Sequence, residues 1–232
     1  MIAITRCALR WMATAGLAML PSGITSAAEQ WNFEYIFSRA AEMYRLDSRA
    51  NARLVAWQHL IESQRSKPLP AQLDAVNHFF NRQLRFEDDQ WIWGEADYWA
   101  TPIESLIKGA ADCEDYAIAK YLSLKQLGVA AEQLRLAYVK SIDLDRAHMV
   151  LVWYADPSAE PLVLDNLTDE ILPASQRPDL LPVYSFNASG LWLAGGGNRQ
   201  VGSSQRLPRW QDLQNKLMLE GFPAAEPNEQ GD

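Results

Sequence analysis

Residues 109–121 read GAADCEDYAIAKY and place a cysteine inside an acidic run at the start of a predicted helix. Apolar residues follow at helical spacing, and Gly128 is a typical C-terminal stop. The pattern predicts a helix over residues 113–127 with Asp112 as its N-cap. Cys113 then lies in the first turn, where the positive end of the helix dipole favours the nucleophilic thiolate.

The first residues of the chain resemble a secretion signal. Two arginines precede the apolar run 11–20, and small residues occupy 26–28, so we expect residues 1–28 to be a cleaved signal peptide. The alternative, an uncleaved membrane anchor, needs about twenty apolar residues. Cleavage removes Cys7 and leaves Cys113 without a disulfide partner. The leading explanation for this thiol is that it acts as a nucleophile. The alternative is that Cys113 is a small, buried apolar side chain.

The composition is that of a globular protein, with 48% hydrophobic and 22% charged residues. We expect one domain over residues 29–222 and a disordered tail over 223–232. The net charge is −8, and loss of a signal with two arginines and no acid leaves −10. Such a surface disfavours nucleic acid and anionic lipid, which bind basic patches, but it is compatible with calcium.

Helical periodicity dominates the N-terminal part and returns near the end of the chain. Residues 31–63 predict two helices with Ser48 as a cap between them, and a further helix follows over 70–85. The aromatic, acidic segment 86–101 has no clear period, so it is either a loop that covers the edge of the core or a wall of a substrate cleft. A final amphipathic helix is predicted over 207–221.

Three short β-like segments, 134–142, 148–155 and 161–167, follow the cysteine helix and predict an antiparallel meander packed on it, hence an α+β fold. His148 begins the second strand and Asp165 is near the end of the third. Because the start of one antiparallel strand lies beside the end of the next, these two side chains are expected to be close.

The chain order Cys113, His148, Asp165 matches a nucleophile, its base and the group that orients the base. The other two histidines, His59 and His78, lie in predicted helices where a surface or core role is the simpler explanation. Asp165 has an alternative role as a turn cap. The order of the three residues is therefore the main argument for a triad.

The sequence closely resembles the bacterial transglutaminase-like cysteine proteinases of the LapG type. The resemblance covers most of the chain after the signal and rests on residues 109–121, 147–151 (AHMVL), 163–167 (VLDNL), 182–187 (PVYSFN) and 190–193 (GLWL).

The resemblance implies a papain-like or transglutaminase-like α+β core, with N-terminal helices and a central nucleophile helix packed on an antiparallel sheet. It implies a calcium-dependent periplasmic endopeptidase that cleaves the N-terminal region of a large, repeat-containing surface adhesin and so releases cells from a biofilm. An inner-membrane cyclic di-GMP receptor is the implied inhibitory partner. By residue match, Cys113, His148 and Asp165 are the triad, and Asp112 and Glu114 are linked to calcium.

The calcium expectation also has a physical motive, because carboxylates on both sides of a thiol oppose its ionisation. A divalent cation held by Asp112 and Glu114 would cancel that effect. Calcium takes six to eight oxygen ligands, so further groups must join, and Asp115, Asp143 and Asp145 are candidates. The alternative is a solvated acidic helix cap, in which Asp115 takes the third position of a capping box.

Two other functions remain open on the sequence. A transglutaminase-type acyl transferase shares the first half-reaction and hands the acyl group to an amine. A non-catalytic, calcium-responsive adaptor would keep the same residues as structure.

Overall fold

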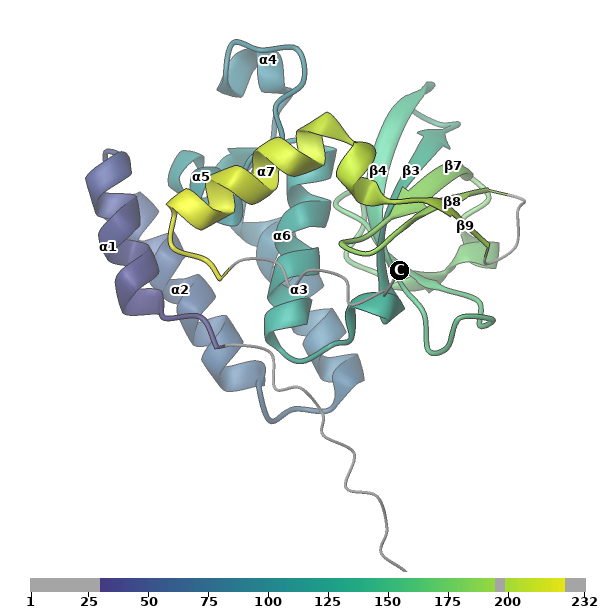
Figure 1. Cartoon of the computed structure of the whole chain (residues 1–232), viewed down its shortest axis with the longest axis horizontal. Helices are drawn as coiled ribbons and strands as arrows, with labels where there is room; N and C mark the ends of the chain where they lie inside the picture. The colour runs from purple at the N-terminus through teal and green to yellow at the C-terminus, as the bar shows by residue number, and fades with distance from the viewer. Residues whose placement is uncertain (1–29, 195–198, 224–232) are drawn as a thin grey trace, which may run out of the picture.

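A computed structural model describes residues 30–194 and 199–223. The predicted signal peptide lies outside the described residues, and so does the predicted tail apart from Pro223. Helices gather on one side of the molecule and a curved sheet on the other, with α6 (Cys113–Gln126) between them (Figure 1). The fold is the predicted α+β arrangement, with a central cysteine helix packed on an antiparallel sheet.

The predicted N-terminal helices are present, with one corrected cap. They are α1 (Phe33–Met43), α2 (Ser48–Gln64) and α3 (Leu69–Gln83). Asp47, and not Ser48, caps α2, because the Asp47 carboxylate accepts a hydrogen bond from the Ala50 N–H at 2.7 Å. Trp57 is buried and donates from Nε1 to Ser123 Oγ of α6 at 2.9 Å, which ties α2 to the central helix.

Residues 85–111, which include the aperiodic segment 86–101, contain more regular structure than the sequence predicted. It comprises β1 (Arg85–Phe86), the short α4 (Asp89–Ile92), α5 (Pro102–Lys108) and β2 (Ala110–Ala111). A capping box between Thr101 and Glu104 starts α5. Gly109 ends it at a φ of 65°, a left-handed conformation that favours glycine. A Cβ there would also lie 2.8 Å from Arg53 Cζ, so the Arg53 side chain would have to shift.

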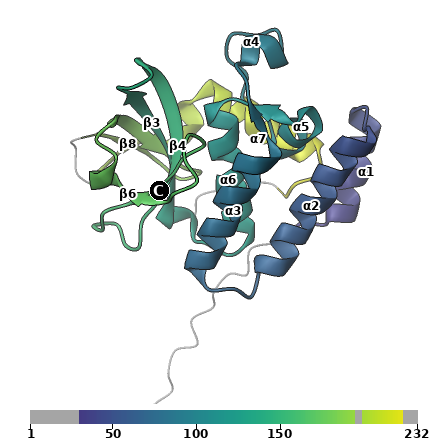
Figure 2. The same ribbon diagram turned by 180° about the vertical axis from the view of Figure 1, so that it is seen from behind.

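A parallel pairing of β1 with β2 places Phe86 beside Ala111. The backbone of Glu87 extends it, donating to the Ala111 carbonyl at 3.0 Å. The start of α4 is thereby held next to the start of α6, although more than twenty residues separate them. The rest of α4 projects from the body of the molecule (Figures 1 and 2).

Within the described ranges, the main sheet has seven strands in the order β6-β5-β4-β3-β7-β8-β9, all antiparallel. The predicted meander is its central part, and four strands were not predicted. The strands are β3 (Leu134–Ser141), β4 (Arg146–Trp153), β5 (Leu162–Leu164), β6 (Leu172–Pro173), β7 (Leu180–Phe186), β8 (Leu191–Leu193) and β9 (Gln200–Gly202). Short 3₁₀ turns precede β3, β7 and the last helix, at Ala131–Gln133, Ala174–Gln176 and Ser204–Arg206.

Helix α6 is enclosed on several sides. It packs on β4 and β3 and against α3, while α7 (Pro208–Leu219), the predicted final helix, crosses in front of it in Figure 1. Ile118, Tyr121 and Leu124 of α6 are almost completely buried. This burial fixes the orientation of the helix that carries Cys113.

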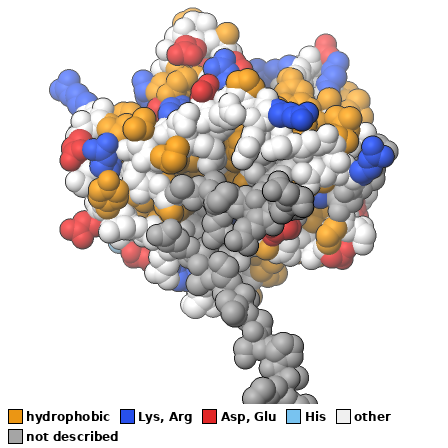
Figure 3. Space-filling view, viewed as in Figure 1, with side chains coloured by type: hydrophobic (Ala, Val, Ile, Leu, Met, Phe, Trp, Pro, Cys, Tyr) orange, Lys and Arg blue, Asp and Glu red, His pale blue; other side chains and the backbone are white. Residues whose placement is uncertain are grey.

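The surface carries both signs of charge. On the face in Figure 3, acidic and basic side chains are interspersed with apolar ones. Within the described ranges, no helix has the length and hydrophobicity to cross a membrane.

Candidate active site

Cys113 is the first residue of α6, as predicted, and its half-buried thiol faces the sheet. The backbone N–H of Met149 on β4 lies close enough to the sulfur to favour the thiolate and lower the pKa of Cys113. The thiol itself donates to Glu114 Oε2 at 3.1 Å. The N-terminus of the helix is therefore packed against the strand that carries His148.

His148 and Asp165 lie side by side, as the strand directions predicted. Their side chains are joined by a 2.8 Å hydrogen bond between Nε2 and Oδ1, and both are buried. The pairing of Leu151 with Leu164 aligns β4 with β5, so Asp165 follows directly after the last paired residue of its strand. This register holds the carboxylate beside the imidazole.

Three donors surround the Asp165 carboxylate. Besides His148, the Leu167 N–H donates to Oδ1 at 3.1 Å and Arg177 Nη2 donates to Oδ2 at 2.8 Å. Burial alone would raise the pKa of Asp165, but these hydrogen bonds and the nearby positive charge lower the pKa to about 2. An ionised carboxylate only accepts hydrogen bonds, so Nε2 of His148 carries the proton and Nδ1 is the basic nitrogen.

Cys113 and His148 both line a cavity of about 360 Å³. Its walls include Trp99, Tyr138 and Tyr184, and residues from the start of α7 close one side. Trp99 serves both of the roles considered for the aromatic segment 86–101, because it lines the cleft and its ring stacks on the buried Phe186. Trp91 does not cover the core, since it is 79% exposed.

The surroundings of the thiol oppose its ionisation. Burial is the largest cause, followed by the charges of Glu114 and Asp112, and together they raise the pKa of Cys113 well above its usual value. The Met149 N–H acts in the opposite direction. The flanking carboxylates raise the pKa of Cys113, as expected from the sequence, but the burial of the thiol raises it more.

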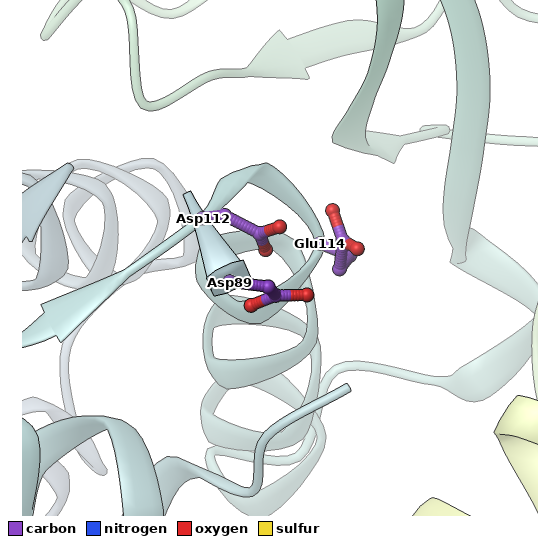
Figure 4. A group of neighbouring side chains, drawn as sticks. All are labelled: Asp89, Asp112 and Glu114. Carbon is purple, nitrogen blue, oxygen red and sulfur yellow. The ribbon is translucent and has the colours of Figure 1, made fainter. Parts of the chain in front are cut away.

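Three carboxylates meet beside the thiol, at the first turn of α6. Asp89, Asp112 and Glu114 each offer an oxygen within 4.8 Å of the others, and their side chains point toward one another in Figure 4. Asp112 holds the N-cap position, as predicted, but its side chain makes no capping hydrogen bond. Its carboxylate turns toward the cluster instead.

The cluster fits a divalent cation. The Oδ1 atoms of Asp89 and Asp112 are buried without a hydrogen-bond partner among the described residues. Burial first, and then neighbouring carboxylates, raise the pKa of Asp89 to about 6 and the pKa of Asp112 to about 11. The carboxylate oxygens of the cluster are close together, and no positive charge of the described residues is beside them to offset their repulsion. A site made only of oxygen ligands suits calcium or magnesium.

The sequence identified two of these acids and missed the third. Asp89 was hidden in a segment without periodicity, and only the β1–β2 pairing brings it to the cluster. Asp115 instead accepts from the Ala100 N–H at 2.7 Å. Asp143 and Asp145 lie in the exposed β3–β4 turn, where Asp145 pairs with Lys140 at 2.8 Å. None of these three further candidates belongs to the cluster.

A fold with a cysteine at the start of a central helix and a His–Asp pair on the adjoining strands is that of a papain-like or transglutaminase-like thiol enzyme. Residues 47–193 match the family described as bacterial transglutaminase-like cysteine proteinase, and the chain belongs to this family.

Solved structures of Legionella pneumophila LapG are similar to this chain. The EGTA-treated form is 44% identical with a TM-score of 0.72, covering 81% of this chain and 98% of that one. The calcium-bound form is 45% identical with a TM-score of 0.68, covering 80% and 98%. A comparison with curated proteins finds no match.

Proposed function

We propose that this chain is a calcium-dependent cysteine endopeptidase with Cys113, His148 and Asp165 as its catalytic triad. The observation that carries the proposal is the hydrogen-bonded His148–Asp165 pair on a cavity that Cys113 also lines. Membership of a cysteine proteinase family agrees with it.

The reaction follows from the protonation states at the site. Asp165 fixes the Nε2–H tautomer of His148, so Nδ1 takes the thiol proton of Cys113. The thiolate attacks the peptide carbonyl carbon, and the imidazolium returns the proton to the amine as the C–N bond breaks. Water then cleaves the thioester and regenerates the thiol. The Cys113 N–H at the start of α6 is the natural first donor to the oxyanion.

Asp89, Asp112 and Glu114 would hold the calcium ion. Support comes from the unpartnered buried oxygens of the cluster and from the calcium-bound form of the LapG relative. When bound, the ion supplies positive charge that offsets the carboxylates beside the thiol and pins the start of α6 to α4.

The proposal also covers the substrate of the enzyme, its partner and its location in the cell. The resemblance favours the N-terminal region of a large repeat-containing surface adhesin as substrate, with release of cells from a biofilm as the outcome. It also favours an inner-membrane cyclic di-GMP receptor as an inhibitory partner. The signal-like residues 1–28 favour export to the periplasm.

The test is proteolysis of N-terminal fragments from candidate exported adhesins by the purified chain from residue 29. Wild type with calcium should yield two shorter peptides, and a chelator should slow the reaction until calcium is restored. C113A should abolish cleavage while keeping the wild-type circular dichroism spectrum. Cleavage by a folded C113A protein would exclude the proposed nucleophile.

The same preparation separates the alternatives. Incorporation of a labelled amine into a glutamine peptide would instead identify an acyl transferase. Calcium-dependent receptor binding without thiol reactivity would identify an adaptor.

A further inference from the structure

Helix α3 contacts both ends of the proposed triad. On one side it packs against α6, the helix that carries Cys113. On another it reaches residues 165–169, the loop that follows β5 and begins with Asp165. Asn77 and Asn81 of α3 make these loop contacts, and they lie four positions apart on one face of the helix.

Asn81 donates to the loop from its side-chain amide. Its Nδ2 lies 3.0 Å from the backbone oxygen of Asp165, 3.1 Å from that of Thr168 and 3.1 Å from Oδ1 of Asp169. Three oxygens around one nitrogen fix the orientation of the amide, because the flipped amide would set its own oxygen against them. The Oδ1 of Asn81 is buried and has no hydrogen-bond partner among the described residues. The amide therefore serves this loop as a donor.

A buried lysine ties α3 to the cysteine helix. Lys120 Nζ donates to Asn77 Oδ1 at 2.7 Å, and Asn77 Nδ2 donates to the Asp169 carbonyl at 3.0 Å. The side chains of Asn77 and Lys120 are completely buried. One turn earlier in α6, the Tyr116 hydroxyl donates to the carbonyl of Leu84, at the end of α3, at 2.7 Å. Helix α3 thus holds α6 and the Asp165 loop at a fixed separation.

Different groups hold the carboxylate and the backbone of Asp165. Arg177 and the Leu167 N–H donate to the carboxylate, whereas Asn81 donates to the backbone carbonyl. Asp165 follows directly after β5, so a loop that is released at this carbonyl can carry the carboxylate away from His148. A displacement of about 1 Å in a catalytic site can cost on the order of 100-fold in rate.

We propose that Asn81 is a positioning residue of the triad, which holds the Asp165 backbone so that the carboxylate stays within hydrogen-bond reach of His148 Nε2. This inference rests on the proposed function, since it takes Asp165 as the group that orients the base. Asn81 does not belong to the residues that line the active-site cleft. Its loss is therefore expected to lower kcat and to leave KM within about twofold of the wild-type value.

N81D is the sharpest variant, because it keeps the shape of the side chain and sets a carboxylate against three oxygens. In the cleavage assay it should lower kcat about tenfold to 100-fold. N81A, which removes the donor without adding charge, should lower kcat less, and N81Q, which keeps an amide, should recover part of the loss. R82M is the matched control, because it removes an exposed pair with Asp169 of the same loop, and it should keep the wild-type kcat.

Proton exchange followed by NMR needs no substrate. The His148 Nε2–H, which is bonded to Asp165, should exchange with solvent about tenfold faster in N81D than in wild type. The Trp57 Nε1–H, bonded to Ser123 in the core, should keep its rate and is the internal control for opening of the whole fold.

The outcomes separate the two proposals. Equal acceleration of both protons would mean that Asn81 only stabilises the fold, and an unchanged His148 proton would mean that it does not hold Asp165; either result overturns the inference. If N81D does not fold, the same comparison with N81A decides. A wild-type protein that cleaves no candidate peptide would count against the proposed protease, while the exchange rates would still test Asn81.

Discussion

Arg177 donates from Nη2 to Oδ2 of Asp165 at 2.8 Å, while Asp179 holds the same guanidinium through Nε at 2.9 Å and Nη2 at 2.7 Å. The group that orients the His148 imidazole is thus itself oriented by a buried arginine. Arg177 is a positioning residue, because it acts on the proposed base through Asp165.

Replacing Arg177 by methionine is expected to destabilise the fold. Removal of one partner leaves the buried Asp165 charge with less compensation, which typically costs about 3–5 kcal/mol. Chemical denaturation at pH 7 should show a loss of that order, and R177K should recover part of it. R82M is the control, since its pair with Asp169 is exposed and 3.8 Å long, so its effect should stay below about 1 kcal/mol.

The same variant should change the acid dependence of stability. In wild type the pKa of Asp165 is lowered to about 2, so its contribution is present above about pH 4 and disappears as the pH falls toward 2. In R177M the native pKa rises, so the gap in unfolding free energy between the two proteins should narrow from pH 5 to pH 2.5. A gap that does not change over this range would mean that Arg177 does not act through the charge of Asp165.

Asp89 is expected to be a calcium ligand equal in importance to Asp112. D89N should weaken calcium binding tenfold or more, because one charged oxygen ligand of three is lost. Calorimetry on chelator-treated protein measures this directly, and the calcium-induced rise in Tm should shrink in parallel. D143N, in the exposed strand turn, should bind calcium as wild type. Equal affinities of D89N and wild type would remove Asp89 from the site.

Local patterns predicted the elements that carry the proposed triad. The cysteine helix has a helical apolar pattern and a glycine stop, and the β-meander has strand-like segments separated by polar turns, so both were found from residues close in sequence. The contact between His148 and Asp165 followed from strand direction alone. Each of these inferences needed only one element or two adjacent ones.

The residues that sequence reasoning missed depend on contacts between distant segments. Asp89 reaches the acidic cluster through a strand pairing of two residues, and Arg177 reaches Asp165 from the C-terminal end of a three-residue 3₁₀ turn. Neither element has a periodic pattern. Asp112 holds the predicted N-cap position, but its carboxylate makes no capping hydrogen bond and lies instead beside Glu114, its neighbour in the sequence, and Asp89, which only the fold brings near.

Glu220 lies at the end of α7. Its titration should lower the free energy of unfolding as the pH rises through neutrality. It is buried and accepts from Tyr44 at 2.8 Å and Thr101 at 2.7 Å. Burial is the main cause that raises its pKa to about 8, so the native state holds a proton that the unfolded chain releases above about pH 4.5. Stability should fall between these pH values, by at most about 1.4 kcal/mol per pH unit from this group.

E220Q should remove that slope, since glutamine keeps the shape without the proton. Urea unfolding of both proteins at pH 5 and pH 8 measures the difference, and E62Q on the exposed face of α2 serves as the control. The idea is wrong if E220Q and wild type lose the same free energy between the two pH values.

Lys120 should have the opposite pH dependence. Lys120 belongs to α6, and its side chain is completely buried and donates from Nζ to Asn77 Oδ1 at 2.7 Å. Burial lowers its pKa to about 7, although Asp165 and Asp169 partly oppose this. Between about pH 7 and pH 10 the unfolded chain therefore binds a proton that the native state has lost. The contribution of Lys120 to stability rises with pH over this interval.

K120M removes this titration, so its unfolding free energy relative to wild type should be highest at pH 6 and should decline at pH 9. Urea denaturation at the two pH values gives the double difference, in which groups common to both proteins cancel. K67M, at an exposed position, should show no such change. If the K120M difference is the same at pH 6 and pH 9, Lys120 is charged throughout, and its interaction with Asp165 must outweigh the desolvation of its ammonium group.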